Sequence, residues 1–164
     1  METKFTCSKN ALTKARSVFC FYAAAVPIIG FVLLIPFLLN GINRISWLAF
    51  IYVLILLFLL YKGYRAYLVL RAVRKTSCSV CRETVSGIST PDPYQKGIDF
   101  QIRKDEIILL EDKIIAAENK REAAGSSSAD ERGYRSIVIH TKTDTYTVFG
   151  IELTEEIKEA LASE

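Results

Sequence analysis

The chain has 164 residues, 51% of them hydrophobic, and a net charge of +3 from 21 basic and 18 acidic residues. The charges are divided unevenly. Residues 1–82 hold eleven Lys and Arg and one acid, for a net +10, whereas residues 83–164 hold ten Lys and Arg and seventeen acids, for a net −7. A nucleic-acid-binding protein would carry its basic residues on the soluble part, so no nucleic-acid partner is expected.

Two long apolar runs without charge, Val18–Leu39 and Ile45–Tyr61, dominate the N-terminal half. They hold 22 and 17 residues, close to the ~20 that cross ~30 Å of hydrocarbon as a helix. The second span lengthens if Lys62 and Arg65 extend toward water while residues 67–70 stay at membrane depth. Because only five residues separate the runs, the sequence predicts a transmembrane helical hairpin.

Basic residues flank the two outer ends of the hairpin, and Arg44 alone lies in its loop. Lys and Arg concentrate on the side that is not translocated, which predicts a multi-pass protein of the cell membrane with both termini in the cytoplasm. Interfacial aromatic residues and cations that attract anionic lipids mark a candidate lipid-binding surface. Its residues are Lys62, Arg65, Arg71, Arg74, Lys75, Trp47, Tyr61 and Tyr64.

The composition divides the chain into four parts. Residues 1–17 form a cytoplasmic segment, residues 18–75 the hairpin with a juxtamembrane helix, residues 76–97 a Ser-, Thr-, Gly- and Pro-rich linker, and residues 98–164 the soluble domain. The linker holds a lone Cys-x-x-Cys, Cys78 to Cys81. With a single His in the chain, the usual four-ligand zinc site cannot form within one protomer. We therefore expect two ordinary thiols and no cofactor.

The soluble domain begins with a β pattern. Ile98, Phe100 and Ile102 alternate with polar residues, as in a half-buried strand. A second apolar stretch, residues 106–110, follows after two residues and predicts a hairpin. The segment Lys113–Ala124 is ambiguous between a third strand at its start and one helix, and the strand is favoured. Residues 118–133 are small and charged, which predicts a mobile loop.

The clearest hairpin joins Tyr134–Thr141 to Thr145–Phe149 and ends at Gly150. A short amphipathic helix follows, with Thr154 as its N-cap and its apolar residues at helical spacing. These residues are Leu153, Ile157, Ala160 and Leu161. The predicted fold is a hairpin of two transmembrane helices plus a small α+β cytoplasmic domain, in which one C-terminal helix closes an antiparallel sheet.

The stretch YRSIVIHTKTDTYTVFGIELTEEIKEAL, from Tyr134 to Leu161, resembles the last two strands and closing helix of a pleckstrin-homology-like (PH-like) domain. Small bacterial membrane proteins of the YcxB-like and bacterial PH type place such a domain directly after a transmembrane hairpin. Residues 4–7, ahead of the helical run 11–15, are similar to their leading strand, which would rejoin the cytoplasmic sheet. Five or six strands are visible here, against seven in a PH fold. The resemblance implies membrane-surface scaffolding or partner binding, without catalytic residues.

The sequence offers no motif for catalysis or transport. It lacks a Gly-rich phosphate loop, a Gly-x-Ser-x-Gly elbow and a His-Glu-x-x-His helix, and the spans contain no ionisable group that would indicate transport. The pair Glu111-Asp112 and His140 are expected on the surface or in structural roles.

The predicted function is therefore a non-enzymatic, membrane-anchored interaction module that docks on a membrane protein complex or on lipid head groups. The expected partners are the bilayer, including anionic lipids, and a membrane protein or further copies of the chain. The alternative is a two-span effector or immunity protein, whose β-domain senses a small ligand and whose hairpin oligomerises.

Overall fold

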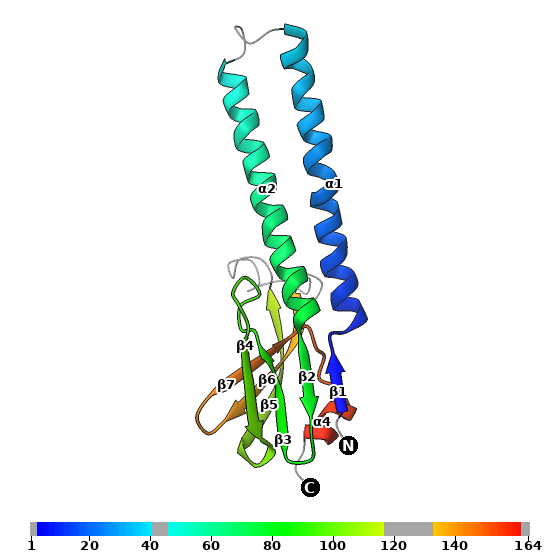
Figure 1. Cartoon of the computed structure of the whole chain (residues 1–164), viewed down its shortest axis with the longest axis vertical. Coiled ribbons are helices and arrows are strands. Elements are labelled where there is room, and N and C mark those ends of the chain that lie inside the picture. The colour runs from blue at the N-terminus through cyan, green and yellow to red at the C-terminus, as the bar shows by residue number, and fades with distance from the viewer. Residues whose placement is uncertain (1–2, 41–45, 117–132, 162–164) are drawn as a thin grey trace, which may run out of the picture.

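Two long helices run side by side along the long axis of the molecule and stand on a β-domain at one end (Figure 1). The computed structural model describes residues 3–40, 46–116 and 133–161. Helices α1 (Lys9–Asn40) and α2 (Ser46–Lys75) have 32 and 30 residues, or about 48 and 45 Å at 1.5 Å per residue. Both are long and apolar enough to cross a membrane. Each exceeds the ~30 Å of a hydrocarbon core, so their lower turns remain for contacts with the β-domain.

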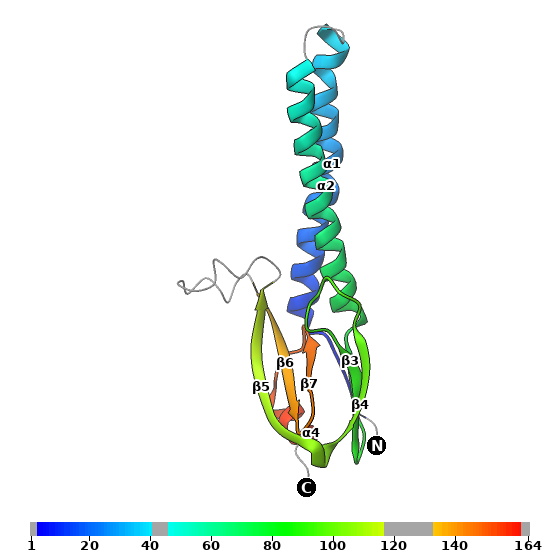
Figure 2. The same ribbon diagram turned by 90° about the vertical axis from the view of Figure 1, so that its left-hand side faces the viewer.

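The described residues form two antiparallel sheets, seen edge-on in Figure 2, and a short C-terminal helix. The order of strands in each sheet follows the sequence. The first sheet contains β1 (Thr3–Thr6), β2 (Ser77–Val80), β3 (Thr84–Ser89) and β4 (Ile98–Arg103), the second contains β5 (Ile107–Ala116), β6 (Gly133–Thr141) and β7 (Thr145–Phe149), and α4 (Glu155–Leu161) follows.

Strands β1 and β2 lie on opposite sides of the hairpin in the sequence and pair with each other in space. Their antiparallel register places Lys4 opposite Ser79 and Phe5 opposite Cys78. The chain therefore leaves the first sheet through α1 and returns to it through α2. The predicted leading strand that rejoins the sheet is confirmed.

The predicted linker over residues 76–97 is wrong for residues 77–80 and 84–89, which form β2 and β3. Its composition is polar since the outward positions of these strands carry Ser, while Val80 and Val85 point inward and are buried. The strands also approach closely. A Cβ at Gly87 would lie 2.7 Å from the Ser77 carbonyl oxygen, so glycine is needed there.

The hairpin predicted between residues 98–103 and 106–110 is also wrong. Strand β4 pairs with β3 and β5 pairs with β6, and a single 3-10 turn, η2 (Lys104–Glu106), carries the chain from one sheet to the other. This corner lets both strands contribute to one core between the sheets, through Ile102 and Leu110.

Of the ambiguous segment Lys113–Ala124, residues 113–116 are strand and continue β5, as favoured. The rest of it lies outside the described residues. So does the predicted loop 118–133, except Gly133, which begins β6.

The last hairpin and the closing helix are confirmed. The Thr141 hydroxyl donates to the Asp144 carbonyl at 2.9 Å and closes the turn between β6 and β7. Gly150 then adopts φ 79°, a conformation that favours glycine. The Thr154 carbonyl accepts the first helical hydrogen bonds of α4, whose Ile157 is buried against the sheets.

The core between the two sheets is built from both inner faces and α4. The rings of Phe100 and Tyr146 stack across it with centroids 4.8 Å apart. Its buried members are Cys78, Val80, Val85, Phe100, Ile102, Ile137, Ile139, Val148, Ile151, Ile157 and Leu161.

A second cluster, which we call the junction cluster, joins the helices to the β-domain. It contains Ala11 and Ala15 of α1, Val69, Leu70 and Val73 of α2, and Tyr134 and Phe149 of the second sheet. Val69 and Leu70, which belong to the conditional extension of the second span through residues 67–70, are buried against protein in this cluster. The Ser8 N–H, which donates to the Gly150 carbonyl at 3.0 Å, strengthens the same junction.

Replacing Phe149 with Ala should loosen the hairpin from the β-domain. Its ring is fully buried, with the Tyr134 ring centroid at 5.2 Å, and removing such a ring costs about 3–5 kcal/mol of unfolding free energy. Denaturation in detergent micelles, followed by circular dichroism, measures this loss. Ile108→Ala, at a residue of the same sheet that is 64% exposed, should change the free energy by less than about 0.5 kcal/mol. Equal losses for the two variants would contradict the junction.

Candidate functional site

The predicted lipid-binding residues lie at different levels along α2. From Tyr61 to Lys75 the helix rises by about 21 Å, at 1.5 Å per residue, whereas each headgroup layer is only about 5–8 Å thick. One layer can therefore include Tyr61, Lys62, Tyr64 and Arg65, but not the cations at the end of the helix. Trp47 lies at the start of α2, and its side chain is outside the described part of the structure.

The three distal cations, Arg71, Arg74 and Lys75, are exposed at the C-terminal end of α2, beside the first sheet. Basic side chains in the last helical turn interact favourably with the helix dipole, which gives Arg74 and Lys75 a structural role. The structure thus separates the predicted set into an upper group, residues 61–65, and a lower group, residues 71–75.

In the upper group, aromatic rings orient the cations. Tyr61 and Tyr64 are exposed, and the Lys62 ammonium lies 5.7 Å from the centroid of the Phe58 ring. The Arg65 guanidinium lies 5.9 Å from the Tyr61 centroid and only 3.8 Å from that of Tyr94. Cation–π contacts of this kind contribute about 0.5–2 kcal/mol, depending on their exposure to water.

Tyr94 belongs to the connection between β3 and β4, residues 90–97, which we call the β3–β4 turn. Asp92 holds this turn together. Its carboxylate accepts from the Tyr94 N–H at 3.0 Å and from the Gln95 side-chain amide at 3.2 Å. The contact between Arg65 and Tyr94 therefore fastens an ordered turn to α2 at the level of the upper group.

Sequence reasoning missed Tyr94. The available signal was Pro91-Asp92-Pro93, a combination typical of a tight turn in which Asp bonds to the backbone two residues later. That signal predicts the turn, but nothing in the sequence points to Arg65 as its contact.

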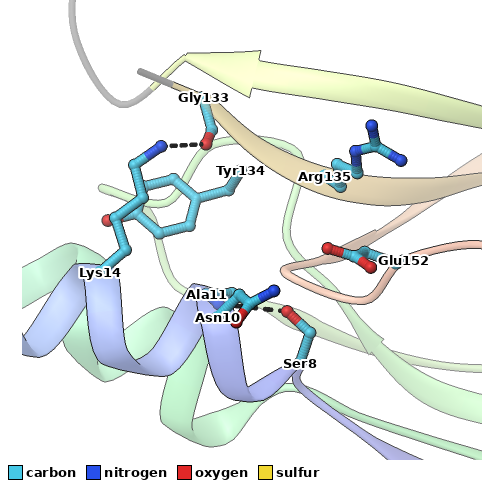
Figure 3. Close-up of a pocket in the computed structure, with 8 residues that line it drawn as sticks. All are labelled: Ser8, Asn10, Ala11, Lys14, Gly133, Tyr134, Arg135 and Glu152. Atoms are coloured by element: carbon cyan, nitrogen blue, oxygen red, sulfur yellow. Dashed lines mark hydrogen bonds between the residues drawn. The ribbon is translucent and has the colours of Figure 1, made fainter. Parts of the chain in front are cut away.

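A polar pocket of about 130 Å³ lies where the start of α1 meets β6 (Figure 3). The Lys14 ammonium donates to the Gly133 carbonyl at 2.8 Å and lies 5.4 Å from the Tyr134 ring centroid. Burial raises the pKa of Tyr134 to about 12, with a smaller contribution from Tyr94. The lining residues are Ser8, Asn10, Ala11, Lys14, Gly133, Tyr134, Arg135 and Glu152.

This pocket is small for a ligand site, because pockets for small molecules usually enclose about 300–1,000 Å³. Several of its polar groups also connect structural elements. Lys14 bonds to β6, and the Ser8 hydroxyl accepts from the Ala11 N–H at 3.1 Å and caps α1. Its geometry fits a polar seam between helix and sheet.

His140 lies on β6 between two polar neighbours. Its Nε2 is 3.4 Å from the Glu111 carboxylate and its Nδ1 is 3.2 Å from the Thr145 hydroxyl. The order hydroxyl, imidazole, carboxylate is that of a catalytic triad. All three side chains are open to solvent on the sheet surface, however, whereas catalysis of this type works in a water-excluded site. The surface role expected for His140 agrees with this position.

The two linker cysteines differ in environment. Cys78 lies in the core, and burial raises its pKa to about 11, so its thiol stays protonated near neutral pH. Cys81 follows the end of β2 and is partly exposed. Both are free thiols. Among the described residues, no group of three or more His, Cys, Asp or Glu could hold a metal ion.

Comparisons of the chain with family models, curated proteins and solved structures give no match. The functional argument therefore depends on the geometry of the molecule itself.

Proposed function

We propose that the protein is a membrane-anchored, non-enzymatic interaction module. In this proposal α1 and α2 cross the cell membrane, and the β-domain docks on a membrane protein complex or on lipid head groups at the cytoplasmic surface. The observation that carries the proposal is the continuity of the hairpin with the β-domain, through the β1–β2 pairing and the junction cluster. A hairpin fixed in this way holds the domain at a set distance from the bilayer.

The surface of the hairpin supports insertion in lipid. Above the junction cluster the helices expose large apolar side chains, a surface much larger than the patches that soluble monomers usually show. In a bilayer, lipid and not water contacts these side chains, so their exposure has no unfavourable free energy of hydration. These residues include Phe21, Ile28, Phe31, Val32, Leu34, Phe50, Val53, Leu54, Leu57, Phe58 and Leu60.

The arrangement of the sheets supports the PH-like part of the proposal. Four strands in one sheet, three in the other and a C-terminal helix are the elements that a PH fold contains. The hairpin is inserted between β1 and β2, as expected from the resemblance to the bacterial PH and YcxB-like families.

The distribution of basic residues supports a cytoplasmic domain. Lys9, Lys14 and Arg16 at the base of α1, and the two basic groups of α2, lie on the side of the β-domain. The short connection between the helices offers only Arg44. By the positive-inside rule, the domain and both termini lie in the cytoplasm.

A test of this orientation uses a membrane-impermeant maleimide on intact cells. Asn43→Cys should add labelling from outside, because the connection between the helices is translocated. The unmodified chain should label at Cys81 only after the cells are permeabilised, since Cys81 is partly exposed on the β-domain. Labelling of Cys81 on intact cells would contradict the orientation.

Native mass spectrometry of the full chain, extracted with its surrounding lipid, tests the interaction module. The proposal predicts a second protein or anionic phospholipid bound at fixed stoichiometry. A homo-oligomer that retains a small molecule other than lipid would contradict it and favour the sensing effector. The continuity of the hairpin with the β-domain is the reason that we prefer the module.

A further inference from the structure

We infer that the hairpin-proximal end of the β-domain is itself a lipid-binding surface, with the β3–β4 turn and Ile98 lying against an anionic bilayer beside α2. This inference depends on the proposed insertion of the hairpin and extends it. It assigns a third membrane contact, separate from the two spans, and it comes from residues that the sequence placed in a linker and a half-buried strand.

The contact between Arg65 and Tyr94 sets the level of the turn. Arg65 follows Tyr61, the last residue of the second apolar run, by four residues, or about 6 Å along the helix. A headgroup layer is about 5–8 Å thick. With the Arg65 guanidinium 3.8 Å from the Tyr94 centroid, the turn lies at the depth of that layer.

The turn is held rigidly at this level. The Thr90 N–H donates to the Thr147 carbonyl at 2.7 Å and joins the turn to β7. At its other end Gly97 packs so closely that a Cβ there would clash with the Ile88 and Thr90 side chains. The exposed side chains of the turn, among them that of Lys96, are therefore presented in a fixed arrangement.

Ile98 provides the apolar part of the surface. It lies on the same face of β4 as Phe100 and Ile102, which are 7% and 6% exposed, yet Ile98 itself is 69% exposed. Strand β5 repeats the pattern. Ile114 lies opposite Arg135 on the face that holds the core residues of β6, and it is 41% exposed at the hairpin-proximal end of the strand.

Two core-facing isoleucines are thus uncovered at the same end of the domain. Figure 2 shows that the β4 end of the β3–β4 turn and the arrowhead of β5 both lie next to the base of the hairpin. A bilayer in which the hairpin is inserted would lie against this end. The occupant that the position indicates is the bilayer interface.

The charges near this end favour an anionic bilayer over a neutral one. Lys62, Arg65 and Lys96 lie at the level of the turn. Asp92 of the turn directs its carboxylate to Tyr94 N–H and Gln95. The η2 corner at the opposite end carries both signs, with Arg103 paired to Asp105 at 3.2 Å. Cations close to an anionic leaflet are attracted over a distance of about one Debye length, ~8–10 Å, so their level decides their effect.

Spin labels on two matched isoleucines test the inference. Ile98 and Ile108 are both exposed strand residues, at opposite ends of the domain. Each is changed to Cys in the full chain, with the four native cysteines replaced, and the labelled protein is reconstituted in vesicles of phosphatidylcholine and phosphatidylglycerol. We expect the label at 98 to collide several-fold less with a water-soluble nickel reagent, and more with oxygen, than the label at 108.

A second comparison tests the role of the Arg65–Tyr94 contact. Tyr94→Ala should release the turn and raise the nickel accessibility of the label at 98. Tyr67→Ala, which removes an exposed tyrosine of the same helix outside the upper group, should leave that accessibility unchanged. Equal effects of the two substitutions would overturn the anchoring of the turn by Arg65.

A third label, at Phe31→Cys in α1, distinguishes a failure of the lipid-binding surface from a failure of hairpin insertion. Equal nickel accessibility at positions 98 and 108, with the label at 31 in lipid, overturns the lipid-binding surface and leaves the inserted hairpin standing. A label at 31 that nickel reaches freely overturns the insertion itself. A label at 98 shielded from both nickel and oxygen overturns the inference, because protein would then cover Ile98.

Discussion

The pairing of β1 with β2 is the constraint on which the rest of the molecule depends. Since these strands are neighbours in one sheet, the chain that leaves through α1 must return through α2 beside it. The start of α1 and the end of α2 therefore lie side by side. The junction cluster, which includes Phe149, then fills the space between the helix bases and the second sheet. Hairpin and domain form one packed unit, not two domains on a tether.

Under the proposed function, this unit determines which part of each helix lipid can reach. The lower turns of α2 bury Val69 and Leu70 in protein. In the proposed insertion, the bilayer boundary therefore falls near Tyr61. The basic residues divide for the same reason. In the proposed insertion those near Arg65 lie at the boundary, whereas those near Lys75 lie beside the first sheet. In the proposed insertion, one helix of 30 residues is thus both a membrane span and a support for the β-domain.

The sequence predicted the elements whose signal is local. Alternation and turn chemistry identified the β6–β7 hairpin, and helical spacing with Thr154 identified α4. It failed where contacts between distant residues decide the structure. The Ser-rich strands β2 and β3 resemble a linker because they contain few apolar residues. The η2 turn resembles a hairpin turn because the local sequence does not indicate that β4 and β5 pair with different strands. The contact of Arg65 with Tyr94, across 29 positions, has no sequence signature.

Cysteine cross-linking across the hairpin tests the β1–β2 pairing most directly. In the full chain with its native cysteines replaced, Lys4→Cys with Ser79→Cys places two thiols on directly opposite residues, about 4.5–5.5 Å apart between Cα atoms. The control, Lys4→Cys with Ser86→Cys, is one strand further, about 10 Å, and beyond disulfide reach. The account predicts rapid oxidation of the first pair and not of the second. No cross-link at 4 and 79, or equal oxidation of both pairs, would contradict it.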